Sequence, residues 1–221
     1  FKKFCRGESD FQNASRPILQ KEMDDCKAAG VEYIELPVAF DALTVVMNPK
    51  NTFLKQITVD ELKKMWEPAA QGKVLRWNQV NPAFPGENLK LYGPGTDSGT
   101  FDYFTAEING EEGASRTDYE PSEDDNIIVQ GVAGDKNALG YFGFTFFEEN
   151  ADKLTAVEID GGKGCVAPSS ETARDGSYAP LSRPLFIYVD KKAFASNPAL
   201  KSFVNFYIEN DTAIAEAAKY I

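Results

Sequence analysis

The residue types best suited to chemistry gather in one short stretch, Gly93 to Thr100, which reads Gly-Pro-Gly-Thr-Asp-Ser-Gly-Thr. An expected strand at 89–92 leads into this stretch, and helical spacing resumes over 101–108. A strand that delivers such a loop to the start of a helix places several backbone N–H groups and three hydroxyls around one point. The pattern therefore predicts a binding site for an oxyanion.

The residues of this loop have complementary roles in holding an anion. Gly95 and Gly99 permit close approach of the backbone, and the helix N-terminus supplies roughly half a positive charge. Ser98 and Thr100 add directional hydrogen bonds from their hydroxyls. The same loop also fits a simpler interpretation, in which Ser98 or Thr100 only caps the helix after a glycine turn.

Two common nucleotide-binding patterns are absent from the loop. A Walker A sequence needs lysine after its second glycine to reach the outer phosphates, whereas Thr100 and Phe101 follow Gly99 here. The glycine fingerprint of dinucleotide-binding folds is also missing. The loop thus gives little support to NTP hydrolysis.

A second candidate site is the turn Asn-Ala-Ser-Arg-Pro at 13–17, before an expected helix at 19–29. Ser15 contributes a hydroxyl and Arg16 a guanidinium, which can hold an anion by charge-assisted hydrogen bonds. Alternatively, Arg16 is a surface arginine beside a helix that begins at proline.

Asp97 is an unusual neighbour for a bound anion. Its carboxylate could accept the proton of a partly protonated phosphate, or it could pair with Arg16. In either role it should repel a fully deprotonated anion such as sulfate.

Composition and charge exclude several classes of function. The chain has 34 acidic and 23 basic residues, a net charge of -11, so most of its surface would repel nucleic acid and anionic membranes. It contains no histidine, which excludes histidine metal sites, Ser-His-Asp triads and Cys-His pairs. We expect no catalytic residue, metal site or cofactor.

Strands alternate with helices along the chain, which predicts an α/β fold with largely parallel pairing. Two extended runs, 31–39 and 42–47, are expected on either side of a break at Phe40-Asp41, and a buried strand is expected over 138–146. Two runs, 42–47 and 183–189, are expected to cross a hinge between two lobes. The predicted lobes are 1–45 with 186–221, and 46–185.

Three cysteines, Cys5, Cys26 and Cys165, allow one disulfide and leave one thiol over. A Cys5–Cys26 bond would close a loop of about twenty residues, worth ~3 kcal/mol in the chain-entropy model. Three buried thiols in a cytosolic protein fit the count equally well.

The segments 9–18 and 93–104 resemble the periplasmic phosphate-binding proteins of ABC phosphate transporters. Further similarity extends the resemblance over nearly the whole chain. The additional matching segments are 45–48, 131–141 and 181–189.

The resemblance implies a two-lobe periplasmic-binding-protein fold of type II that closes on inorganic phosphate. By motif, Ser98, Gly99 and Thr100 resemble the donors at the helix N-terminus, and Ser15 resembles the donor from the other lobe. The well-studied enteric form resembles Ser-Asp where this chain has Ser15 and Arg16, and has arginine at the position of Pro94. We therefore expect Arg16 to replace that arginine and Asp97 to supply the acceptor.

The resemblance also implies a partner and a location. We expect a monomer outside the cytoplasm, delivering phosphate to an ABC permease, and that compartment favours an oxidised Cys5–Cys26 pair. The family has an N-terminal phosphate loop before the position of Phe1 and extends beyond that of Ile221, so the chain is expected to lack both parts.

Two other classes of function fit the same residues. A phosphatase-like enzyme would use Asp97 and Asp102 for phosphoryl transfer, although no metal cluster or activated nucleophile supports it. A surface phosphate sensor or adhesin could use the same fold, because fold alone does not determine function.

Overall fold

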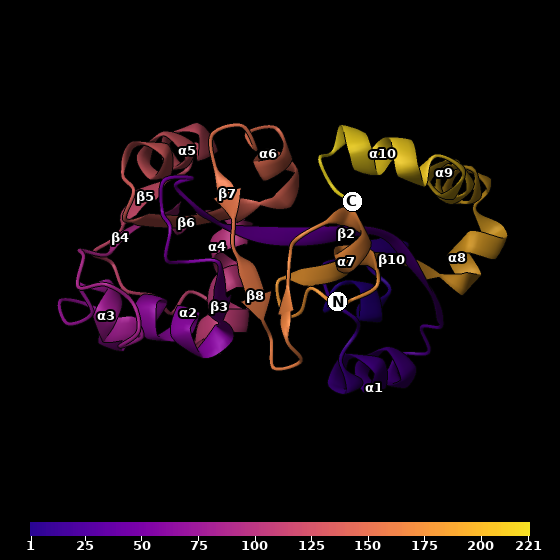
Figure 1. Cartoon of the computed structure of the whole chain (residues 1–221). Helices are drawn as coiled ribbons and strands as arrows, with labels where there is room; N and C mark the ends of the chain where they lie inside the picture. Colours follow the sequence, from indigo (N-terminus) through magenta and orange to yellow (C-terminus); the bar gives the residue numbers. More distant parts are fainter. The chain divides into compact units, whose positions relative to one another are not determined.

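The computed structural model describes residues 1–221, which form two compact units. Unit 1 comprises Phe1–Asp41 and Arg183–Ile221, and unit 2 comprises Ala42–Ser182. Figure 1 shows each unit as a sheet with helices packed around it. No helix of the structure is both long enough and apolar enough to cross a membrane.

Unit 1 is built on three strands in the order β1-β10-β2. β1 and β10 run antiparallel, with Phe11 opposite Val189. Strand β2 begins in unit 1 and continues into unit 2, while β10 starts at the last residue of unit 2. The elements are η1 (Phe4–Arg6), β1 (Phe11–Ala14), α1 (Gln20–Ala28), β2 (Tyr33–Met47), β10 (Ser182–Asp190), α8 (Lys191–Ser196), α9 (Pro198–Glu209) and α10 (Asp211–Ala217).

A disulfide between Cys5 and Cys26 joins η1 to α1, with an S–S distance of 1.99 Å. Both cysteines are buried, in a cluster with Phe4, Ile18 and other apolar side chains of unit 1. Of the two interpretations of the cysteine count, the structure therefore has the disulfide, and Cys165 is the free thiol.

Unit 2 contains the sheet that carries the oxyanion loop. Its strands lie in the order β2-β6-β4-β5, and β3, β8 and β9 form a smaller sheet. The helical elements include a π-helical turn, η3, directly after α4. The bounds are β3 (Gln56–Thr58), α2 (Val59–Trp66), η2 (Pro68–Ala70), α3 (Trp77–Val80), β4 (Lys90–Pro94), α4 (Gly99–Phe104), η3 (Thr105–Asn109), β5 (Glu120–Ser122), α5 (Asp125–Gly134), β6 (Ala138–Gly143), α6 (Phe144–Glu148), β7 (Thr155–Ala156), β8 (Glu158–Asp160), β9 (Cys165–Val166) and α7 (Ser170–Arg174).

The expectation of largely parallel pairing is wrong, because the sheets are mixed. β4 runs parallel to β5 and β6, as expected for strands joined through helices. β2 instead runs antiparallel to β6, and β1 antiparallel to β10. The difference arises because β2 and β10 carry the chain between the units, so they do not belong to strand–helix–strand repeats.

Two predicted strand boundaries also need correction. The expected break at Phe40-Asp41 does not exist, because the N–H and C=O of Phe40 are both hydrogen bonded to Ile221 and β2 stays extended. The run expected as one strand over 138–146 ends at Gly143, and α6 begins at the next residue, Phe144. Its apolar residues continue across the boundary, so hydrophobicity alone did not reveal the change.

Candidate functional site

The loop Gly95–Thr100 joins the end of β4 to the start of α4, which confirms the predicted strand-loop-helix order. The loop turns tightly because the N–H of Ser98 donates to the carbonyl of Gly95 at 3.2 Å. Ser98 is the N-cap of α4, and its Oγ accepts the N–H of Thr100 at 3.2 Å. The first N–H groups of a helix have no intrahelical acceptor, so this turn presents donors for a ligand.

The capping role of Ser98 leaves its hydroxyl proton available. The cap uses a lone pair of Oγ, whereas an anion would accept the proton that the same oxygen carries. Ser98 therefore caps the helix, and this role is compatible with anion binding. Asp97, Ser98, Gly99 and Thr100 lie on one turn of unit 2, and their role as ligands stays a prediction.

An aromatic cluster packs against the end of β4, from which the loop begins. Trp66 meets Tyr141 edge-on at 5.0 Å between ring centroids, and Phe104 stacks on Tyr141 at 3.7 Å. The hydroxyl of Tyr119 donates to the carbonyl of Pro94 at 2.7 Å. This hydrogen bond joins the end of β4 to the residue directly before β5. Burial raises the pKa of Tyr119 to about 12 and that of Tyr141 well above its usual value, so both phenols stay neutral.

Gly93 allows β4 to pass close to this aromatic cluster, and we predict that Gly93→Ala destabilises the fold. A methyl group at Gly93 would lie 2.9 Å from Cε1 of Tyr141 and 3.3 Å from Trp66. Overpacking of this kind lowers the free energy of unfolding by about 1–3 kcal/mol, which urea titration would measure. Gly99→Ala is the matched control, since no atom lies within 4 Å of a methyl group there. Equal stability of the two variants would contradict the prediction.

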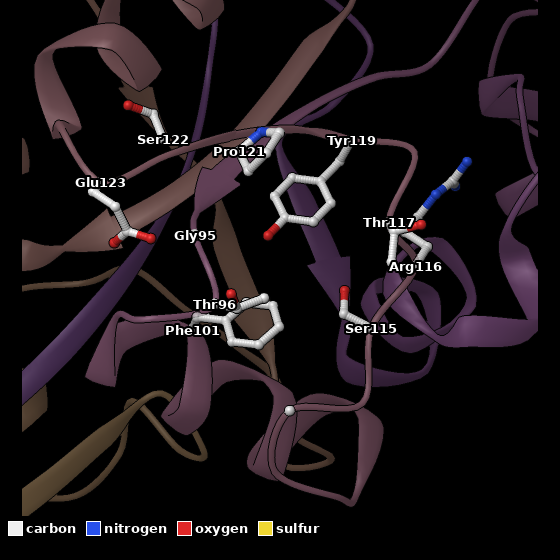
Figure 2. Close-up of a pocket in the computed structure, with 11 residues that line it drawn as sticks. Gly95, Thr96, Phe101, Ser115, Arg116, Thr117, Tyr119, Pro121, Ser122 and Glu123 are labelled. Atoms are coloured by element: carbon white, nitrogen blue, oxygen red, sulfur yellow. The ribbon is translucent and has the colours of Figure 1, made fainter.

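A cavity of about 370 Å³ opens beside the loop in unit 2. Figure 2 shows its lining, with Glu123 close to Gly95 and Tyr119 opposite. The carboxylate of Glu123 lies at the limit of hydrogen-bond distance, 3.5 Å, from the N–H of Asp97. A side chain at Gly95 would overlap this carboxylate, so glycine is required for Glu123 to lie against the loop.

Arg116 also lines the cavity, but its guanidinium is already engaged. It bonds the carboxylate of Asp118 at 2.6 and 2.9 Å, and it donates to the carbonyls of Met65 and Val74. The hydrogen bond from Arg116 lowers the pKa of Asp118 to about 2. Arg116 therefore fixes the chain path rather than offering charge to an anion. This network is not predictable from the sequence pattern, because its partners are up to 51 residues apart.

In unit 1, Ser15 and Arg16 follow β1 and are exposed, as a binding role requires. Arg16 pairs with Glu22 through two hydrogen bonds of 2.9 Å. Arg16 thus has a carboxylate partner within its own unit, Glu22, and pairing with Asp97 of unit 2 stays a prediction. The roles of Ser15 and Arg16 as ligands stay predictions.

Comparison with known proteins places this architecture in a family. Residues 1–211 match the model of a PBP superfamily domain. The chain belongs to the PBP superfamily. Its mixed α/β fold is that of the type II periplasmic binding proteins.

Three relatives within this superfamily are particularly similar. The chain is 55% identical to protein SphX of Synechocystis and 39% identical to the phosphate-binding protein PstS of Staphylococcus haemolyticus, in both cases over its whole length. It covers 66% of the first protein and 68% of the second. A crystal structure from Planctomyces limnophilus, described as a possible phosphate binding protein, is 47% identical with a TM-score of 0.91, and the alignment covers all of this chain and 78% of that one.

The expected resemblance to phosphate-binding proteins is thereby confirmed. The chain is homologous to PstS and SphX over its entire length and spans about two thirds of these curated relatives. The names of the PstS relative and the solved structure describe binding of phosphate rather than catalysis.

Proposed function

We propose that this chain binds inorganic phosphate without altering it chemically. The observation that carries the proposal is the Gly95–Thr100 turn, which places the hydroxyl residues Ser98 and Thr100 and the first-turn N–H groups at the start of α4. The homologous PstS protein is a phosphate-binding protein by name, and this supports phosphate as the anion.

The residues have distinct roles in this proposal. Ser98, Gly99 and Thr100 donate hydrogen bonds from unit 2, and Ser15 and Arg16 are further donors from unit 1. Asp97 accepts the proton of a partly protonated phosphate, which a fully deprotonated sulfate cannot offer. Closure of two lobes on the ion is a prediction of the same proposal.

The proposed physiological role is delivery of phosphate to an ABC permease from outside the cytoplasm. The Cys5–Cys26 disulfide supports an oxidising compartment, because such bonds are rare in the cytosol. A net charge of -11 makes a locally built anion site necessary, since the surface as a whole repels anions. The chain is expected to act as a monomer in this role.

Calorimetric titration with phosphate and with sulfate near pH 7 tests the proposal. We expect stoichiometric, reversible binding of phosphate and at least tenfold weaker binding of sulfate, about 1.4 kcal/mol. Incubation with a chromogenic phosphomonoester is the control for a phosphatase and should release no product. A folded chain that binds no phosphate, or that hydrolyses the ester, would overturn the proposal.

A further inference from the structure

The guanidinium of Arg16 is only partly occupied by its neighbours in unit 1. Its Nη1 donates to Oε2 of Glu22 at 2.9 Å and to the carbonyl of Pro17 at 3.1 Å, while Nη2 donates to Oε1 of Glu22 at 2.9 Å. A guanidinium has five N–H donors, and these contacts use three of them. The two that remain, on Nε and Nη2, lie along one edge of the group. That edge is itself a fork that can bind two oxygens of a phosphate.

The side chain that holds Arg16 is itself held in place. Glu22 is in the first turn of α1, and its Oε2 also accepts the N–H of Leu19 at 2.9 Å. Helix α1 is joined to η1 through Cys26. Glu22 therefore has little freedom to move with the side chain that it binds.

A second contact restricts the guanidinium from another direction. The ring of Phe1 lies 5.4 Å from Cζ of Arg16, within the range of a cation–π interaction. The same ring meets Tyr188 edge-on at 4.9 Å, so it is packed against the interior of unit 1. Arg16 is exposed, yet its orientation is defined by Glu22 and Phe1 together.

We propose that Glu22 is a positioning residue for anion binding, which holds Arg16 so that its Nε–Nη2 edge is presented as a pre-formed fork to phosphate. The inference rests on the proposed function, in which Arg16 is a ligand. A long side chain that is already ordered loses less conformational entropy when the ligand binds, and affinity rises accordingly.

A competing role for Glu22 predicts the opposite sign. If Glu22 sequestered Arg16 from the anion, removing its carboxylate would free the guanidinium and raise phosphate affinity. Loss of a negative charge would also raise the affinity for any anion, because it weakens long-range electrostatic repulsion. A decrease in affinity is therefore specific to the positioning role.

The decisive variant is Glu22→Gln, because glutamine can keep the hydrogen bond to Leu19 that caps α1. When the amide oxygen of glutamine accepts the N–H of Leu19, its NH2 group takes the position of Oε1. Arg16 then loses the second of its two acceptors. Asp24→Asn is the matched control, since Asp24 is on the same helix and its side chain bonds Gln20 rather than Arg16. Both variants remove one negative charge.

Calorimetric titration of the full chain with inorganic phosphate would compare the wild type, both variants and Arg16→Ala. We expect a five- to tenfold loss of affinity in Glu22→Gln and no loss in Asp24→Asn. In an Arg16→Ala background, Glu22→Gln should have no further effect, because the two residues act through one another. Unchanged or higher affinity in Glu22→Gln, or wild-type affinity in Arg16→Ala, would overturn the inference.

A spectroscopic readout separates this inference from the proposed function. The Nε–H resonance of Arg16, assigned by its loss in Arg16→Lys, should be resolved in the wild type, shift on addition of phosphate and broaden in Glu22→Gln. A wild-type chain that binds no phosphate refutes the proposed function. A wild type that binds phosphate without shifting this resonance refutes only the role of Arg16 and Glu22.

Discussion

Replacing Ser98 with alanine is expected to weaken phosphate binding at least tenfold, about 1.4 kcal/mol. The hydroxyl of Ser98 accepts the N–H of Thr100 and in the proposed site donates its own proton to the anion. Alanine removes both interactions, and a hydrogen bond to a charged group contributes about 1.5–3 kcal/mol. The loss should be measured by calorimetric titration with phosphate.

Ser169→Ala is the matched control for this experiment. Ser169 caps α7 in the same unit, and its Oγ accepts the N–H of Thr172 at 3.0 Å, but no ligand role is proposed for it. Each variant therefore loses a helix cap, which costs about 1 kcal/mol of stability. We expect reduced affinity only in Ser98→Ala. Wild-type affinity in Ser98→Ala, or an equal loss in both variants, would show that Ser98 is a cap alone.

Removal of the disulfide by Cys5→Ala with Cys26→Ala is expected to lower the free energy of unfolding by about 3 kcal/mol. The bond closes a loop between residues 21 positions apart, and without it the unfolded chain gains conformational freedom. Truncation of two buried sulfur-containing side chains adds to the loss. Urea unfolding of the double variant and the oxidised wild type would measure the difference.

Two further samples make the disulfide experiment specific. Cys165→Ala removes the thiol that has no disulfide partner, and its stability should change by less than about 0.5 kcal/mol. Wild-type chain kept in a thiol reductant should also lose stability, but less than the double variant, because its cysteine side chains are not truncated. Equal stability of the double variant and the oxidised wild type would contradict the prediction.

The sequence predicted best those features that depend on near neighbours. Thr58 and Glu61, three positions apart as a capping box requires, form one at the start of α2, where the N–H of Glu61 donates to the Thr58 hydroxyl at 3.1 Å. The loop before α4 likewise follows from glycine and hydroxyl residues within eight positions. Such features are decided by local geometry, which the order of residues contains directly.

Features that depend on distant residues were not predictable in the same way. β2 continues through Phe40 because Ile221, at the far end of the chain, supplies its hydrogen bonds. Tyr119 and Glu123 adjoin the loop because β5 pairs with β4, although they lie 25 and 26 positions from the residues that they contact. The pairing of Arg16 with Glu22, six positions away, was also not predicted. The sequence offered Asp97 as a candidate carboxylate for Arg16, and the pattern alone did not single out Glu22.

Wherever the surroundings shift the pKa of a side chain in this chain, they move it further from 7. Phenols such as Tyr119 and Tyr141 move upward through burial, and Glu22 and Asp118 move downward through their arginines. Histidine, the side chain that ordinarily titrates near pH 7, is absent from the sequence. The charge that these groups present to a ligand is thus constant over the physiological range. Any change in phosphate binding across that range would therefore report the protonation of the ion more than that of its receptor.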